Sequence, residues 1–258
     1  MKIEDFSKNG YLVVKNCLTT GILKKIRNEV LKNNNSSYKE FCKAISKLNE
    51  SDFFTFLNPI NINLLNKNLI SEILLQKKIY DVLVKLLGSD LAVSCESSLT
   101  LNIKESKKNY YFKDWHQEIW SGADVSHLQL WFPVFQKTSS FGQLAFIEKS
   151  HQWGLVPNSD RRPVNLPKKY KIIQTKLEFG DLLIFSTTLL HKTMITKFPR
   201  LGLAMTVKNF KYSDESFSKN INWKIFSYSE ISKLQRVLGN HYLSPFRLLN
   251  IESKIKLN

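Results

Sequence analysis

The first ninety residues carry apolar side chains at helical spacing. An apolar residue at every third or fourth position predicts a helix over residues 20–32, which Thr19 or Thr20 can cap. A second stripe of this kind predicts a helix over residues 71–87. Only the short run 11–14 is β-branched and apolar enough to indicate a strand. We therefore expect a mostly helical N-terminal part.

The middle of the chain has a different pattern, with short β-branched and aromatic runs separated by turn residues. Many short strands in succession are typical of a β-sandwich or barrel and not of alternating strands and helices. We therefore expect a β core in this region. The candidate strands cover residues 99–103, 114–119, 126–132, 143–147, 172–177, 181–186 and 203–210.

The last part of the chain contains one further helix signal. Ser227 and Glu230 have the spacing of a capping box, and Gly239 follows the apolar stripe that begins after them. No internal repeat and no long polar linker divides the sequence. We expect a single domain over residues 1–258, with a helical N-terminal part (about 1–90), a β core (about 91–210) and a C-terminal helical extension (about 211–258).

The charge is strongly positive, with a formal net charge of +16. Such a balance first suggests nucleic acid or an acidic membrane as a partner. However, 32 of the 38 basic residues are lysine and only 6 are arginine, and the lysines are scattered. Arginine is the residue that best recognises phosphates and base edges, because its planar fork binds them through two hydrogen bonds. We therefore expect a small-molecule substrate and consider a nucleic-acid partner unlikely.

Other features of the sequence indicate the cellular setting. No apolar run is long enough to span a membrane, and the acidic residues near the N-terminus do not fit a secretory signal. Cys17, Cys42 and Cys95 are far apart and form no C-x-x-C motif. This pattern indicates neither a disulfide framework nor a zinc ribbon. We expect a cytoplasmic protein.

The candidate chemistry lies in the β region. His116 and Glu118 are two positions apart, and in a strand over 114–119 their side chains would project to the same face. His191 follows at the end of a later apolar run. Two histidines and one carboxylate form the facial triad of non-heme Fe(II) oxygenases, which leaves positions open on the metal. By spacing alone, a structural His–Glu pair and a zinc hydrolase remain alternatives.

Two strands near these residues carry polar groups on one face. In the run that begins at Arg200, this arginine shares a face with Gly202 and Ala204, two small residues that leave room for a ligand. A guanidinium that points into such a space requires an anionic partner, such as a dicarboxylate. On the strand over 126–132, Gln129 and Trp131 share a face with His127. If that face lines the interior, Gln129 and Trp131 flank a cofactor.

Several segments, in order, resemble the phytanoyl-CoA dioxygenase family of Fe(II)/2-oxoglutarate-dependent oxygenases. The resemblance covers roughly residues 1–210, and its specificity lies in the ordered set of motifs. One of them is Trp115-His116-Gln117-Glu118, which is similar to the family's W-H-Q-D metal motif. Glu118 departs from the family pattern, since it stands in place of the usual aspartate. The other matching segments are residues 9–14, 128–133, 142–151 and 180–191, with Arg200 in the place of the family's 2-oxoglutarate arginine.

The resemblance implies a fold and a reaction. The fold would be mainly β with flanking helices, around a double-stranded β-helix (jelly-roll or cupin-like) core. The protein would use Fe(II), 2-oxoglutarate and O₂ to hydroxylate an aliphatic C–H bond of a small-molecule metabolite. The residues implied are His116, Glu118 and His191 as iron ligands, Arg200 and Thr193 for the distal carboxylate of 2-oxoglutarate, and Lys104 and Asn102 near the co-substrate or substrate.

Two other classes of protein remain compatible with these residues. One is a non-catalytic small-molecule-binding protein on the same fold, in which Glu118 has weakened the metal site. The other is a zinc-dependent hydrolase or cupin-like enzyme that uses the same three ligands. The second class would need neither 2-oxoglutarate nor Arg200.

Overall fold

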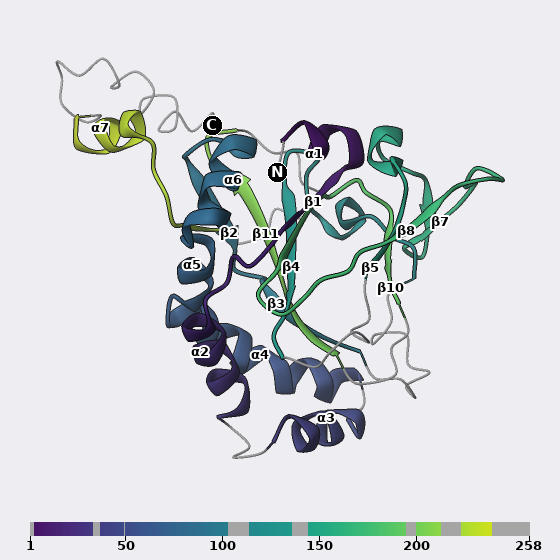
Figure 1. Ribbon diagram of the computed structural model, residues 1–258, viewed down its shortest axis with the longest axis horizontal. Helices are drawn as coiled ribbons and strands as arrows, with labels where there is room; N and C mark the ends of the chain where they lie inside the picture. Colours follow the sequence, from purple (N-terminus) through teal and green to yellow (C-terminus); the bar gives the residue numbers. More distant parts are fainter. Residues whose placement is uncertain are drawn as a thin grey trace, which may run out of the picture.

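The protein contains two antiparallel sheets that face each other, with helices packed on the outer face of the larger one (Figure 1). The computed structural model describes residues 3–32, 37–48, 50–102, 114–135, 144–194, 200–212 and 223–238. This mainly β arrangement with flanking helices confirms the fold class expected from the sequence.

The larger sheet has seven strands and the smaller sheet has three. The order of the larger sheet is β1 (Tyr11–Val14), β9 (Leu182–Ser186), β4 (Leu128–Pro133), β11 (Arg200–Asn209), β2 (Leu91–Ser94) and β12 (Trp223–Ile225), with β3 (Ser98–Asn102) also paired to β11. The order of the smaller sheet is β10 (His191–Thr193), β5 (Leu144–Ile147) and β8 (Ile172–Gln174). A separate hairpin joins β6 (Asn158–Ser159) and β7 (Arg162–Pro163).

The helices lie mostly before the sheets in the sequence. They are α1 (Glu4–Asn9), α2 (Thr20–Leu31), α3 (Tyr38–Ser46), α4 (Glu50–Asn66), α5 (Leu69–Leu74), α6 (Lys77–Leu87) and, after the last strand, α7 (Glu230–Leu238). As expected, Thr19 caps α2, because its hydroxyl accepts a hydrogen bond from the backbone N–H of Ile22. Among the described residues, no helix combines the length and the apolar character that a membrane crossing requires.

The apolar residues of the larger sheet are divided between its two faces. Along β9, Leu182 and Ile184 pack against the helices, while Leu183 and Phe185 face the smaller sheet. Side chains of a strand point alternately to either face, so a strand that is buried on both sides is apolar throughout. The space between the two sheets therefore contains a core of its own, and the candidate site lies in it.

Two of the expected elements differ from the structure. The helix expected over residues 71–87 is two helices, α5 and α6, because Gln76 is extended (φ −58°, ψ 126°) and begins a new helix. Its side-chain amide donates to the carbonyl oxygen of Glu72, which the break leaves without a helical partner. Helices α3 and α4 lie in the part that was expected to be mostly helical, but neither was assigned individually; in α4, four asparagines and Pro59 interrupt the helical signal. The strand expected over 114–119 was also wrong, as the candidate site explains.

Candidate metal centre

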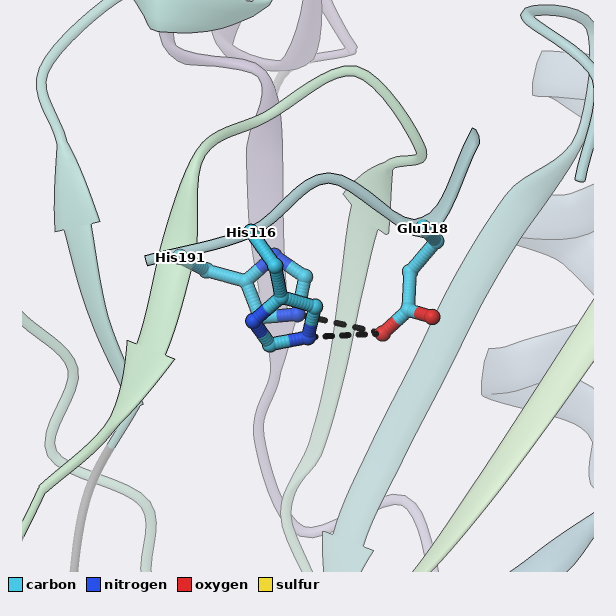
Figure 2. A group of neighbouring side chains, drawn as sticks. All are labelled: His116, Glu118 and His191. Carbon is cyan, nitrogen blue, oxygen red and sulfur yellow. Dashed lines mark hydrogen bonds and ion pairs between the residues drawn. The ribbon is translucent and has the colours of Figure 1, made fainter. Parts of the chain in front are cut away.

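Three side chains with metal-ligating atoms converge between the two sheets. Figure 2 shows His116 and His191 with their rings side by side and both directed at the carboxylate of Glu118. Glu118 Oε1 lies 3.1 Å from His191 Nε2 and 3.5 Å from His116 Nε2. The ligand atoms of all three residues lie within 4.8 Å of one another. The two histidines are buried and Glu118 is half-buried.

Backbone hydrogen bonds determine which imidazole nitrogen faces the cluster. His116 Nδ1 lies 2.6 Å from the carbonyl oxygen of Asp114, and His191 Nδ1 lies 2.9 Å from the carbonyl oxygen of Leu189. A carbonyl oxygen only accepts, so each Nδ1 must carry the proton. Each neutral ring then presents the lone pair of Nε2 to the cluster. This is the arrangement that metal-ligating histidines commonly use to fix their tautomer.

The spacing of these atoms fits a divalent metal ion. Two ligands bound at right angles, each about 2.1 Å from a metal, lie about 3 Å apart. The two measured separations from Glu118 Oε1, 3.1 Å and 3.5 Å, are close to that value. Neutral imidazoles together with a carboxylate suit iron, zinc and similar ions. Glutamate in place of aspartate therefore still reaches the two histidines.

The segment that carries His116 and Glu118 is not a strand. His116 forms an isolated bridge with His191, in which each residue donates its N–H to the other's carbonyl oxygen (2.9 and 3.0 Å). The N–H of Glu118 then donates to the carbonyl oxygen of Thr187, and Glu118 begins a 3₁₀ helix, Glu118–Ser121. The expectation that a common strand face unites His116 and Glu118 was wrong. Pairing with the segment 187–191 brings them together instead.

Gln117 lies between the two ligands and holds the segment in place. Its side chain is fully buried. The amide nitrogen donates to the carbonyl oxygens of Gly154 and Thr188, and the amide oxygen accepts from the N–H of Val156. One side chain thus satisfies three backbone groups on two loops. Burial of an amide is favourable only when its groups are paired in this way.

A cavity of about 220 Å³ extends from the three ligands between the sheets. Three residues expected from the sequence, Gln129, Trp131 and Thr193, line it together with His116, Glu118 and His191. The polar face of β4 therefore does point inward, although His127 is not among the lining residues. Gln129 Oε1 accepts a hydrogen bond from the Thr206 hydroxyl (2.7 Å), which leaves its amide N–H groups as donors.

Gly202 has a different role from the one expected. A Cβ atom at this position would lie 2.2 Å from Trp131 Cζ2, so the space beside Gly202 is filled by the indole ring. The indole N–H donates to the Thr100 hydroxyl at 3.1 Å, which fixes the ring across β11. The small residue therefore provides room for Trp131. Ala204, two residues on, does line the cavity.

Three of the expected site residues fall partly or wholly outside the described structure. Lys104 lies outside the described residues. Arg200 and Asn102 are paired with each other in the register of β11 and β3, at the end of these strands, but their side chains lie outside the described part. Their assignments stay predictions.

Seven polar residues on the cavity wall were not expected. One is Ser121, at the end of the 3₁₀ helix that begins at Glu118. The other six lie on strands β2, β3 and β11 and on the turn between β2 and β3: Ser94, Glu96, Ser97, Ser98, Thr100 and Thr206. The available signal was the alternation in β3, where Ser98 and Thr100 alternate with Leu99 and Leu101. Short hydroxyl side chains are common on solvent-exposed faces, so this signal alone does not indicate a cavity.

Comparison with known proteins gives a consistent result. The family model described as phytanoyl-CoA dioxygenase matches residues 6–200. No curated protein sequence matches the chain. Among solved structures, the non-heme monooxygenase ThoJ is similar with a TM-score of 0.63 and 16% identity, over 88% of this chain and 84% of ThoJ.

Two further solved structures have the same fold. The epimerase SnoN, in complex with Fe³⁺, α-ketoglutarate and nogalamycin RO, has a TM-score of 0.57 and 14% identity, over 79% of this chain and 80% of SnoN. EctD from S. alaskensis, with 2-oxoglutarate and 5-hydroxyectoine, has a TM-score of 0.57 and 16% identity, over 83% of this chain and 78% of EctD. At these identities the similarity establishes the fold.

Proposed function

Because this chain belongs to the phytanoyl-CoA dioxygenase family, we propose that it is an Fe(II)- and 2-oxoglutarate-dependent oxygenase that hydroxylates an aliphatic C–H bond of a small-molecule metabolite. One observation carries the proposal. Two imidazoles with Nε2 turned inward meet a carboxylate on the wall of a cavity between the sheets. The whole chain would form one domain, with the β core between N-terminal helices and a C-terminal extension.

The residues of the cluster would hold the metal ion. His116, Glu118 and His191 supply two neutral nitrogens and one carboxylate oxygen, which leaves the remaining coordination positions open to the cavity. Fe(II) bound there would supply O₂ activation coupled to the decarboxylation of 2-oxoglutarate. The backbone carbonyls of Asp114 and Leu189 would keep the two imidazoles oriented.

Other residues would bind and orient the co-substrate. Arg200 at the start of β11 would pair with the distal carboxylate of 2-oxoglutarate, helped by the Thr193 hydroxyl. Gln129 would donate an amide N–H to a carboxylate or keto oxygen, and Trp131 would form an apolar wall beside it. We retain Lys104 and Asn102 as further candidates for contact with co-substrate or substrate.

The first test is turnover of 2-oxoglutarate. Purified protein supplied with Fe(II), 2-oxoglutarate and air should form succinate even without its substrate, at a slow rate. Glu118→Gln removes the anionic ligand and should abolish succinate formation. Glu148→Gln is the matched control, because Glu148 pairs with the exposed Lys171 and does not line the cavity. Succinate formation at the full rate in Glu118→Gln would remove this residue from the metal site.

The same fold accommodates a second outcome. SnoN is an epimerase, so inversion of a C–H centre is the alternative to hydroxylation within this proposal. Hydroxylation adds one oxygen atom to the substrate, whereas epimerisation leaves its mass unchanged. Mass spectrometry of the product therefore separates the two reactions. Turnover that needs no 2-oxoglutarate would instead indicate a zinc hydrolase or a cupin-like enzyme.

A further inference from the structure

We propose that the wall of the cavity formed by β2, β3 and their connecting turn binds a cationic, donor-rich group of the substrate, such as an ammonium or guanidinium. This inference rests on the proposed function and adds a substrate class to it. It is carried by the carboxylate of Glu96, by the direction of the hydrogen bonds along this wall and by the absence of lysine and arginine from the described residues that line the cavity.

Glu96 lies on a turn that hydrogen bonds hold firmly. The Ser97 N–H and hydroxyl both donate to the carbonyl oxygen of Ser94, at 3.2 and 2.7 Å, and the Ser94 hydroxyl accepts from the N–H of Glu96 at 3.1 Å. Ser94 and Ser97 are buried, while Glu96 is exposed. The turn therefore holds Glu96, which lines the cavity, on a backbone that these hydrogen bonds fix.

Glu96 has no cationic partner among the described residues. Within the described part of the chain it forms no ion pair, although the protein has a net charge of +16. Glu118 is the other acidic residue among those that line the cavity, and its charge would be offset by a bound metal ion. Among the described lining residues, the charge of Glu96 is therefore the one that a cationic ligand could pair with.

The hydroxyls beside Glu96 offer acceptors to the cavity. The O–H of Ser97 is donated to the carbonyl oxygen of Ser94, and that of Thr100 to the carbonyl oxygen of Gly202. A hydroxyl has one proton and two lone pairs, so only lone pairs of these two hydroxyls remain for a ligand, and one lone pair of Thr100 already accepts from the Trp131 indole N–H. Thr206 is in the same state, since it donates to Gln129 Oε1. An ammonium group, with three donors and no acceptor, complements this wall.

The strand register places this wall away from Arg200, the residue expected to bind the distal carboxylate of 2-oxoglutarate. Ser98 lies opposite Ala204 on β11, so the turn that carries Glu96 is beyond that point, towards Thr206. Arg200 lies four residues earlier on the same strand. At the rise of a β-strand, Arg200 and Ala204 are about 13 Å apart. The anionic co-substrate and a cationic substrate group would therefore occupy opposite ends of the cavity, with the metal ligands exposed to both.

The test measures binding next to the metal site with three sugars that differ only at one carbon. The probes are 6-amino-6-deoxyglucose, glucose and glucuronate, which are cationic, neutral and anionic at pH 7. Mn²⁺ replaces iron and relaxes the protons of any probe bound near it, in the presence of 2-oxoglutarate. Relaxation of water protons reports separately whether Mn²⁺ itself binds.

The amino sugar should bind about fivefold more tightly than glucose, as expected for an ion pair at an exposed carboxylate, and glucuronate should bind most weakly. The preference should disappear in Glu96→Gln and persist in Glu148→Gln, a carboxylate that does not line the cavity. Equal binding of the three sugars, no binding of the amino sugar, or a preference that survives in Glu96→Gln would overturn the inference. Failure of Mn²⁺ to bind would overturn the proposed function as well.

Discussion

A methyl group added at Gly202 should destabilise the protein and deform the cavity. In Gly202→Ala the new Cβ would lie 2.2 Å from Trp131 Cζ2 and 2.5 Å from Trp131 Nε1, whereas ordinary contact begins at 3.4 Å. The indole ring must therefore move by about 1 Å, and it is only 4% exposed. Its hydrogen bond to the Thr100 hydroxyl, 3.1 Å long, would be lost in that movement.

The cost follows from these two effects. Overpacking of a well-filled site costs about 1–3 kcal/mol, and a lost hydrogen bond about 1 kcal/mol. We expect the free energy of unfolding of Gly202→Ala to fall by about 2–4 kcal/mol, which lowers the melting temperature by roughly 4–8 °C for a chain of this size. Because Trp131 lines the cavity, the variant should also bind 2-oxoglutarate more weakly in its metal-loaded form.

Urea unfolding of two further variants of this protein makes the test specific. Gly21→Ala is the matched control: the nearest atom to the added methyl is Thr19 Oγ1 at 4.0 Å, and in helix α2 alanine should be neutral or stabilising by up to about 1 kcal/mol. In a Trp131→Phe background, which lacks the indole atoms nearest the methyl, Gly202→Ala should cost less than about 1 kcal/mol. An unchanged stability of Gly202→Ala, or an equal cost in both backgrounds, would refute the steric argument.

Four further experiments test separate parts of the structure. Gln117→Leu should lower the unfolding free energy by about 2–4 kcal/mol and weaken metal binding about tenfold, because three backbone groups, two of them in buried hydrogen bonds, lose their partners. Metal titration that matches the wild type would contradict this positioning role. Burial, and secondarily Asp181, raises the pKa of Cys17 to about 12, so iodoacetamide at pH 8 should label the half-buried Cys95 well before Cys17, as peptide mapping would show. The same raised pKa means that the unfolded thiol ionises first, so the stability of the wild type relative to Cys17→Ala should fall as pH rises from about 9 towards 12; a constant difference would contradict it. Saturation with Mn²⁺ at 100 times its dissociation constant should raise the unfolding free energy by about 2.7 kcal/mol, and the same concentration should leave His191→Ala unchanged.

Local patterns were sufficient to predict much of the sheet. The alternation in β4 correctly separated the buried apolar residues Leu128, Leu130 and Phe132 from Gln129 and Trp131, because a strand turns successive side chains to opposite faces whatever its neighbours are.

The conformation of the segment that carries His116 and Glu118 depends on contacts between distant parts of the chain. The strand pattern of 114–119 was overridden by hydrogen bonds from His116 and Glu118 to His191 and Thr187, about 70 residues away in sequence. The structure brings His116, Glu118 and His191 together, through a local geometry other than the one expected, and their role as metal ligands stays a prediction. The order of motifs across the chain indicated these three residues, whereas the spacing of His116 and Glu118 alone was insufficient.

The cavity wall formed by β2, β3 and their connecting turn was not predicted, because its hydrogen-bonding character depends on which residues pair in three dimensions. The hydroxyls of Ser97 and Thr100 offer only acceptor sites because each already donates its hydrogen bond, to the carbonyl oxygens of Ser94 and Gly202 respectively. Likewise, Glu96 is one of 22 acidic residues in the sequence, and nothing beside it in the chain distinguishes it. The register of β3 on β11 brings these residues to the cavity.

The most direct test of the central claim is the visible absorption of the protein under anaerobic conditions with Fe(II) and 2-oxoglutarate. Chelation of 2-oxoglutarate by iron at His116, Glu118 and His191 predicts a weak charge-transfer band that is absent with either addition alone. The band should disappear in His191→Ala. A protein that binds the metal but gives no band would contradict the oxygenase proposal and favour the zinc or cupin-like class, and a protein that binds no metal would be a binding protein on this fold.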